Sequence, residues 1–179
     1  MKSSIFCLMM FLLMLANPSI AQEPVEEPEQ AAPLSVRQLN TKPWIYSMEE
    51  ALRDPENTYK LSLKGQKLKT LPAALYRLKN LQMLDLSDNK LKELPDTLQI
   101  FPNLQYLSLR NNKLRVLPPS IGALQNLEVL YLGSNKFIAV PAYVGGLGRL
   151  KRLDVSLNPV TTYEIEQLAR KLPKCKVTY

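Results

Sequence analysis

Side chains that could carry out catalysis are scarce in this sequence of 179 residues. It contains no histidine, which is the commonest general base near neutral pH, the commonest metal ligand and a member of every Ser-His or Cys-His catalytic arrangement. Two carboxylates, Asp85 and Asp154, occupy equivalent positions of the repeat described below, but they lie about 14 Å apart at one strand spacing per repeat. That distance exceeds the separation that either class of glycosidase uses. No phosphate-binding or zinc-protease motif occurs, so we expect neither enzyme activity nor a bound metal ion or cofactor.

Lysine recurs every 23 residues. This Lys column consists of Lys67, Lys90, Lys113 and Lys136. Four like charges about 5 Å apart repel one another, so their long side chains must extend into solvent. The Lys column could bind a phosphate or uronate polymer, or it could simply keep exposed loops soluble.

Asparagine follows the same period. The asparagines are Asn89, Asn112, Asn135 and Asn158. We interpret them as structural, because a buried amide can satisfy the backbone donors and acceptors of tightly stacked turns. A site for a hard cation would instead contain carboxylates at these positions.

A repeat of 23 residues positions all of these side chains. Copies of the pattern LxxLxLxxNxLxxLPxxLxxLxN begin at Leu81, Leu104, Leu127 and Leu150, and a weaker copy begins at Thr58. The alternation in LxLxx predicts a short strand whose leucines point inward. Single repeats cannot bury this leucine face, so successive strands must pair in parallel and stack. The stacked leucines are Leu84, Leu107, Leu130 and Leu153, and the return segment backs them with residues such as Leu94, Leu98 and Phe101. Its proline keeps the chain extended or opens a short turn.

Both ends of such a stack need caps. Ser47-x-x-Glu50 predicts a short helix that ends near Arg53, and Thr161-x-x-Glu164 predicts a helix through Lys171. Trp44 to Tyr46 is interpreted as a lid on the first repeat, and the alternative for Trp44 is contact with a ligand, since exposed tryptophan is rare outside interfaces. Leu172-x-x-Cys175-x-Val177 restores the opening spacing of the repeat. It therefore predicts a closing strand in which Cys175 points inward beneath the last helix.

The N-terminal region predicts export. A lysine, an apolar run over residues 5–15 and the small residues Ser19 and Ala21 indicate a cleaved signal peptide. We expect residues 1–21 to be the signal peptide, 22–42 an acidic Pro/Glu-rich linker, 43–57 the N-terminal cap, 58–160 the repeats and 161–179 the C-terminal capping helix and closing strand. The mature chain is expected to lack a membrane span and to be periplasmic or secreted. Residues 22–57 carry 3 basic and 8 acidic side chains, whereas residues 58–179 carry 19 basic and 8 acidic ones.

Residues 58–179 resemble bacterial leucine-rich-repeat proteins of the 23-residue, LP-containing class, and SMEEALRDPENTYKLSLKGQKLKTLP resembles the opening segment of exported members. The resemblance implies an α/β solenoid, a right-handed superhelix with short parallel strands on its concave face and helical caps at both ends. Members of this family are binding scaffolds, usually for proteins, and most often use the concave strand face.

Outward strand positions predict the binding surface. Apolar and aromatic side chains at its centre with charged ones around them are typical of an interface hot spot, although such residues also simply favour strands. The candidate partner-binding residues are Lys60, Met83, Asp85, Tyr106, Ser108, Arg110, Val129, Tyr131, Arg152 and Asp154. We expect a non-enzymatic exported recognition module that binds a protein. The alternatives are a binder of anionic envelope glycans through the Lys column and the basic C-terminal end, or a purely structural envelope component. Nucleic acid is not expected as a partner.

Overall fold

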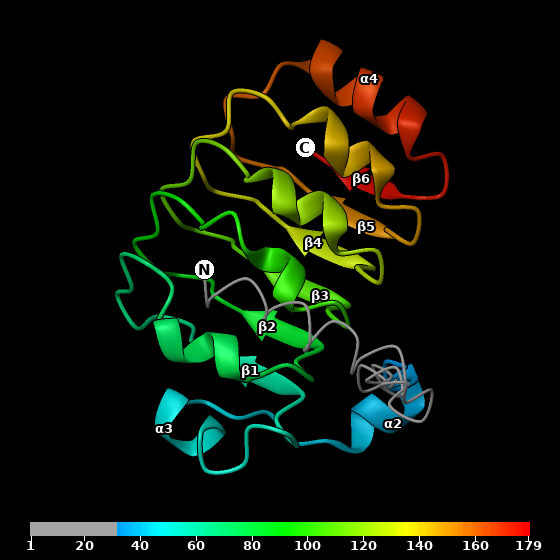
Figure 1. The fold of residues 1–179 in the computed structure, drawn as a ribbon. Coiled ribbons are helices and arrows are strands. Elements are labelled where there is room, and N and C mark those ends of the chain that lie inside the picture. The colour runs from blue at the N-terminus through cyan, green and yellow to red at the C-terminus, as the bar shows by residue number, and fades with distance from the viewer. Residues whose placement is uncertain (1–31) are drawn as a thin grey trace, which may run out of the picture. The chain divides into compact units, whose positions relative to one another are not determined.

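The computed structural model describes residues 32–179, so the predicted signal peptide and the start of the linker lie outside the described residues. Six parallel strands form one sheet in chain order, β1 to β6 (Figure 1). Their bounds are β1 Lys60–Ser62, β2 Met83–Asp85, β3 Tyr106–Ser108, β4 Val129–Tyr131, β5 Arg152–Asp154 and β6 Lys176–Thr178. The chain is therefore an α/β solenoid, as the repeat predicts.

Leucine side chains from neighbouring strands stack into a continuous core. Leu84 of β2 pairs with Leu107 of β3, which pairs in turn with Leu130 of β4. Leu107 is 2% exposed and Leu130 is fully buried. The predicted register of β2 to β5 is thus confirmed.

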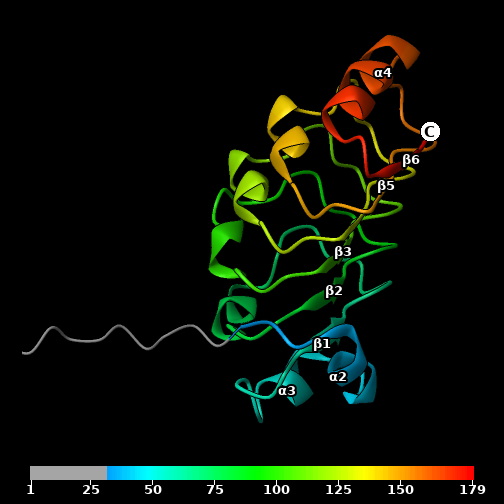
Figure 2. The same ribbon diagram turned by 90° about the vertical axis from the view of Figure 1, so that its right-hand side faces the viewer.

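The second layer consists of short 3-10 helices on the opposite side of the core from the sheet (Figure 2). They are η1 Ala73–Arg77, η2 Leu98–Ile100, η3 Pro119–Ala123 and η4 Ala142–Gly146. Pro72, Pro118 and Pro141 precede three of them in extended conformation. Proline suits this place because its fixed φ opens the turn and its missing N–H is not needed there.

The repeated asparagines bond the backbones of consecutive turns. Asn112 Nδ2 donates to Leu86 O of the preceding repeat and to Leu109 O, both at 3.0 Å, and its Oδ1 accepts from Leu91 N at 3.0 Å. The amides of Asn89, Asn135 and Asn158 make equivalent bonds. Their predicted structural role is confirmed.

The N-terminal region differs from the expected linker. Val36–Thr41 form helix α2, in which Ser35 and Gln38 make a reciprocal capping box and Leu39 is buried. Gln105 Nε2, in the third repeat, donates to Leu34 O at 2.9 Å. Residues 32–179 cluster as one compact unit. The part of the predicted linker that the structure describes is therefore ordered from Leu34 onward, because it buries an apolar side chain and pairs its backbone with the repeats.

The predicted N-terminal cap follows α2. Ser47 Oγ accepts from Glu50 N at 3.1 Å and begins helix α3, Met48–Ala51. Ile45 pairs in parallel with Leu61 of β1. The cap thus adds one more bridge to the edge of the sheet.

The C-terminal cap is helix α4, Thr162–Lys171, which begins with the predicted Thr161–Glu164 capping box and buries Ile165 and Leu168. The register of the closing strand is different from the prediction. Val177, rather than Cys175, pairs with Leu153. The last turn contains α4 where other repeats have a shorter 3-10 helix. Because this connection is longer, the residue that pairs with Leu153 comes two positions later in the chain than predicted. In residues 32–179 no helix is both long and apolar enough to cross a membrane.

Candidate functional site

The solvent-facing side of the sheet, called the sheet face here, brings the predicted partner-binding residues together. Strand pairing places Lys60, Met83, Tyr106, Val129 and Arg152 in one column and Ser62, Asp85, Ser108, Tyr131 and Asp154 in the next. Arg110 follows β3 and lies beside the second column. The positions are therefore adjacent, but their exposure differs.

Three aromatic rings form a row on the sheet face. Trp44 meets Tyr106 edge to face, with ring centroids 6.4 Å apart and an interplanar angle of 81°. Tyr106 meets Tyr131 in the same way at 5.7 Å and 79°. All three side chains are half-buried, so each presents part of its surface to solvent while its neighbours hold it. We call Trp44, Tyr106 and Tyr131 the aromatic row.

The prediction assigned Trp44 to the cap, with ligand contact only as an alternative, and left it out of the partner-binding residues. The Ile45–Leu61 bridge extends the sheet register by one strand, which places Trp44 in line with Lys60 on the sheet face. The alternation of Trp44, Ile45 and Tyr46 was the available signal. It was weak because the segment precedes the first repeat and has no copy elsewhere.

Lys60 is not available to a partner in the way that the prediction assumed. It is 6% exposed, and its Nζ lies 5.9 Å from the centroid of the Trp44 ring. A cation over an aromatic face is attracted by the ring quadrupole. Lys60 therefore packs its ammonium group against the Trp44 ring, and little of its side chain remains for a partner.

Asp154 and Ser108 are buried as well, at 8% and 4% exposure. Asp154 Oδ1 accepts from Ser156 N at 2.9 Å and from Ser156 Oγ at 2.6 Å, so it caps its own turn. Its Oδ2 lies 3.8 Å from Arg110 Nη1, two repeats away. These bonds make Asp154 a positioning residue for Arg110.

Gly133 stands between Arg110 and Ser156 in the repeat register. A Cβ there would lie 3.0 Å from Asp154 Oδ2 and from Ser156 Oγ. The missing side chain leaves space for the Arg110–Asp154 pair to span the fourth repeat. Asp85 makes the equivalent turn bond, with its Oδ1 accepting from Ser87 N at 2.9 Å.

The electrostatic environment keeps the Tyr106 hydroxyl neutral. Burial raises the pKa of Tyr106, and the negative charge of Asp85 raises it further. A neutral phenol can both donate and accept a hydrogen bond. Tyr106 therefore combines an apolar ring with a polar group, a combination that favours interfaces.

A shallow depression extends the site toward β6, the last strand of the sheet. It is lined by Tyr131, Arg152, Leu153, Asp154, Lys176 and Thr178. Lys176 pairs with Arg152, and both side chains are exposed. The corrected register of β6 thus adds Lys176 to the cations beside the aromatic row, and the predicted partner-binding residues did not include it.

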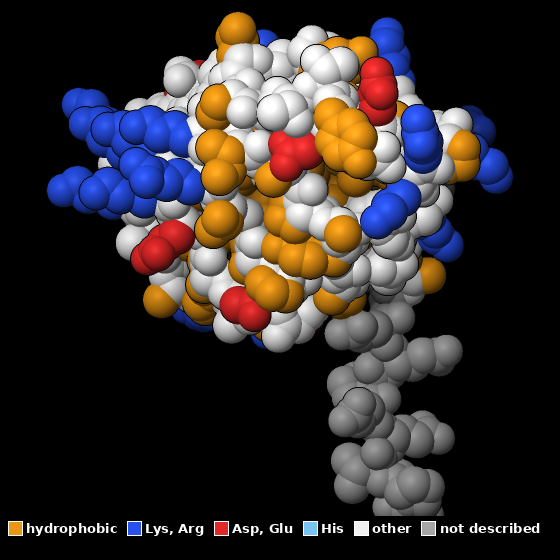
Figure 3. All heavy atoms as spheres, turned by 90° about the horizontal axis from the view of Figure 1, so that it is seen from above, with side chains coloured by type: hydrophobic (Ala, Val, Ile, Leu, Met, Phe, Trp, Pro, Cys, Tyr) orange, Lys and Arg blue, Asp and Glu red, His pale blue; other side chains and the backbone are white. Residues whose placement is uncertain are grey.

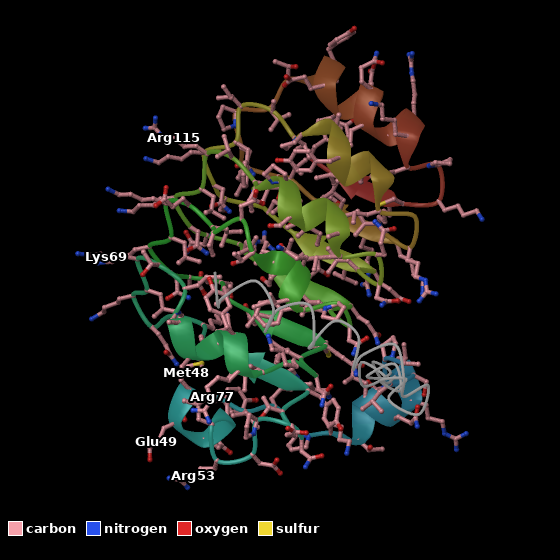
Figure 4. All side chains as sticks on the ribbon, in the orientation of Figure 1. Met48, Glu49, Arg53, Lys69, Arg77 and Arg115 are labelled. Carbon is pink, nitrogen blue, oxygen red and sulfur yellow. The ribbon has the colours of Figure 1, made fainter. Side chains whose placement is uncertain are left out.

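The Lys column lies on a different surface. Its four lysines are exposed, in the loops that connect each strand to the following 3-10 helix, and we call this side of the solenoid the loop edge. Backbone bonds of 2.8 Å from Lys113 N to Leu91 O and from Lys136 N to Leu114 O stack these loops. A second column, Lys69, Lys92 and Arg115, runs beside the first. Lys69 and Arg115 point away from the solenoid on the same side in Figure 4, and basic side chains project from that side in Figure 3.

Cys175 packs against the edge of the core and is not one of its fully buried residues. The two-residue displacement of β6 puts it in line with Lys151 at the start of the strand rather than with Leu153. The thiol is half-buried, and burial raises its pKa. The prediction of an inward residue shielded beneath the helix is wrong in position, although the neutral thiol that it implied agrees with the direction of the pKa shift.

We expect Cys175 to react with a maleimide in the native protein, more slowly than in the urea-unfolded chain. Only the thiolate reacts, and a raised pKa reduces its fraction at neutral pH. The native rate should continue to rise above the pH at which the unfolded chain reaches its plateau. Labelling rates followed by mass spectrometry across a pH series test this. Complete protection until global unfolding would contradict the half-buried position.

The described residues offer no group of three or more His, Cys, Asp or Glu side chains that could hold a metal ion. The buried side-chain nitrogen and oxygen atoms in this part of the chain all have hydrogen-bond partners.

Comparison with known proteins identifies the class. The leucine-rich-repeat family profile matches residues 56–114 and 102–160, so the chain belongs to the leucine-rich-repeat family. A solved leucine-rich-repeat protein from Leptospira interrogans is 36% identical over 75% of this chain, with a TM-score of 0.68. Internalin C2 from Listeria monocytogenes is 25% identical over 68% of this chain, with a TM-score of 0.56.

A Drosophila melanogaster structure, the SNF/U2A′ complex, is 27% identical over 65% of this chain and 70% of its own, with a TM-score of 0.57. The present chain spans 34% of the Leptospira protein and 52% of the internalin. A search of curated protein sequences gives no match. Leucine-rich-repeat domains generally mediate protein–protein interactions.

Proposed function

We propose that this protein is an exported recognition module that binds another protein through the aromatic row of its sheet face. The observation that carries the proposal is the row itself. Tyr106 of the third repeat meets Trp44 of the N-terminal cap and Tyr131 of the fourth repeat, both edge to face. Such contacts fix the rings before a partner arrives, which reduces the conformational entropy lost on binding.

The surroundings of the row match the composition of protein interfaces. Tryptophan, tyrosine and arginine are the residues enriched in binding hot spots. The half-buried Met83 and Val129 flank Tyr106 in the strand register, and the exposed Arg110 and Arg152 lie at the margin of the row. A partner with an apolar centre and acidic margins would complement this surface. One of the similar structures is itself a complex of proteins, which supports the same choice.

The export part of the proposal rests on the N-terminal pattern of residues 1–21. Fractionation of cells that produce the natural chain tests it. N-terminal sequencing of the exported protein is expected to begin at Gln22.

The alternative ligand is an anionic envelope glycan bound by Lys67, Lys90, Lys113 and Lys136. Their exposure is compatible with it. The two functions use different surfaces and differ in salt dependence, because contacts between exposed charges are screened whereas burial of apolar rings is not. Binding that survives high salt therefore favours the aromatic row.

We expect Tyr106→Ala to weaken binding of the protein partner at least 30-fold, or about 2 kcal/mol, as for a central hot-spot residue. The partner would first be captured from envelope extract with the chain that begins at Gln22. Its affinity would then be measured with purified proteins by calorimetry at low and high salt. The expected affinity changes little with salt.

Tyr163→Ala is the matched control, because Tyr163 is 69% exposed and belongs to α4 rather than the sheet face. It should leave binding unchanged. The proposal is wrong if the captured protein binds Tyr106→Ala as well as the parent, or if moderate salt releases it. Urea unfolding of both variants shows whether an affinity loss reflects loss of folding.

A further inference from the structure

Equivalent positions of the loop edge hold different kinds of side chain in different repeats. Comparison of the repeats therefore shows which side chains depart from the common pattern. After each strand, the chain turns through a corner residue with positive φ. The corner residues are Gly65, Asp88, Asn111, Ser134 and Leu157. The first four are the small or polar residues typical of left-handed turns, whereas the last is a large apolar residue.

Leu157 is unfavourable at its corner in two ways. Its φ is 56°, a conformation in which Cβ crowds the backbone of an L-residue. Its side chain is also 77% exposed, so it gains no stabilisation from the core. The turn has a positive φ in every repeat, so the unusual feature of this corner is its side chain and not its backbone. An exposed leucine at a position that favours small or polar residues is a candidate for a contact outside this chain.

Two further apolar side chains replace polar ones on the same edge. Ile138 is 71% exposed at the position that holds Lys69, Lys92 and Arg115 in the other repeats. Val116 is 63% exposed where the first two repeats hold Thr70 and Glu93. Neither side chain contributes to the core.

One hydrogen bond between turns joins the segment of Ile138 to the segment of Leu157. Phe137 N donates to Asn158 Oδ1 at 3.0 Å, which ties the turn of Leu157 to the segment that contains Lys136 and Ile138. Figure 3 shows a row of hydrophobic side chains next to the basic side chains that project from this side of the solenoid. The loop edge thus presents apolar groups beside positive charge.

Cations dominate the rest of the edge. They are Lys67, Lys69, Lys90, Lys92, Lys113, Arg115 and Lys136, and all are exposed. Two carboxylates accompany them. Asp88 is bound by Lys64 Nζ at 3.3 Å and by Asn111 Nδ2 at 2.8 Å, and Glu93 is exposed. The edge therefore retains a clear excess of positive charge.

We propose that the loop edge docks on an anionic lipid membrane. The cations would contact lipid headgroups, and Leu157, Ile138 and Val116 would enter the interfacial region. Basic residues near an anionic leaflet attract it strongly, and exposed apolar side chains add affinity by burial at the headgroup boundary. A soluble polyanion would use the charges but would leave the three apolar side chains in water, so the lipid surface fits all of the observations. The sheet face is a different side of the solenoid and stays available for a protein.

Vesicle binding tests the proposal. The chain that begins at Gln22 is used, because the apolar run of the predicted signal peptide would bind lipid by itself. It is expected to co-sediment with vesicles of phosphatidylcholine that contain phosphatidylglycerol, but not with vesicles of phosphatidylcholine alone. Lys113→Gln combined with Arg115→Gln should weaken this binding about 25-fold, at about fivefold for each cation removed.

Leu157→Asn combined with Ile138→Gln tests the apolar part. Asparagine occupies the same corner in another repeat, at Asn111 with φ 53°, so Leu157→Asn should not destabilise the fold. We expect this double variant to lose at least tenfold in vesicle affinity while retaining the urea midpoint of the parent. Val36→Ser is the control, since Val36 is 57% exposed but belongs to α2. It should bind vesicles like the parent.

Two results would overturn the proposal. One is the absence of binding to the anionic vesicles. The other is unchanged vesicle binding by the apolar double variant together with equally salt-sensitive binding to polygalacturonate, which would make the edge a general polyanion site. Binding of the protein partner to Tyr106→Ala is measured separately, so failure of either idea leaves the other testable.

Discussion

Leu107→Ala is expected to lower the free energy of unfolding by roughly 2–5 kcal/mol, the usual range for removal of a buried leucine side chain. Leu107 is 2% exposed and lies between Leu84 and Leu130 in the middle of the stack. Occupied layers above and below limit the collapse of the cavity. Urea unfolding followed by circular dichroism measures the change.

Lys113→Ala, in the same repeat, is the control for Leu107→Ala. Its side chain is exposed, so its removal should change stability by less than about 0.5 kcal/mol. Equal destabilisation by the two substitutions would show that the register of the leucine column is wrong.

A second large effect is expected for Asn112→Ala. The side chain is 8% exposed and bonds Leu86 O, Leu109 O and Leu91 N. Its removal leaves a buried N–H and buried carbonyl groups without these partners, and each such group costs about 1–3 kcal/mol. We expect a loss of roughly 2–4 kcal/mol in the same urea experiment.

Asn80→Ala is the control for Asn112→Ala. It shows whether the loss of an asparagine that makes a single hydrogen bond has the same effect as the loss of one that makes several. Asn80 is half-buried and makes one bond, from Nδ2 to Glu56 O at 2.8 Å. Its replacement should cost less than about 1 kcal/mol. If both variants lose the same stability, the amides of Asn89, Asn112, Asn135 and Asn158 are not the main bonds between the turns.

The repeat could be predicted because each copy has nearly the same neighbours. Leu84, Leu107 and Leu130 each pack between two equivalent layers, so one pattern determines all of their positions. This equivalence ends at the caps. The closing strand was displaced by two residues because α4 replaces a 3-10 helix, and helix α2 was missed because the Pro/Glu-rich composition around it outweighed the Ser35–Gln38 capping box.

Exposure on the sheet face was harder to predict than position. The period of two assigned Lys60 and Asp154 correctly to the outer side of the strands. It gave no information about side chains from other segments, and Trp44 covers Lys60 while the turn of Ser156 and the side chain of Arg110 enclose Asp154. These contacts join residues that a single-repeat pattern treats as independent.

The contact of the N-terminal segment with the third repeat alters the folding cooperativity of the solenoid. A repeat protein in which each turn touches only its neighbours behaves as a one-dimensional chain that frays from both ends. Here Leu34 O accepts from Gln105, 71 residues away, and Trp44 packs on Tyr106. The N-terminal segment therefore cannot detach without breaking contacts of the third repeat, so we expect this segment and the first three repeats to unfold together. We therefore expect fraying mainly at the C-terminal end, which carries α4, and faster amide exchange there than at the N-terminal end.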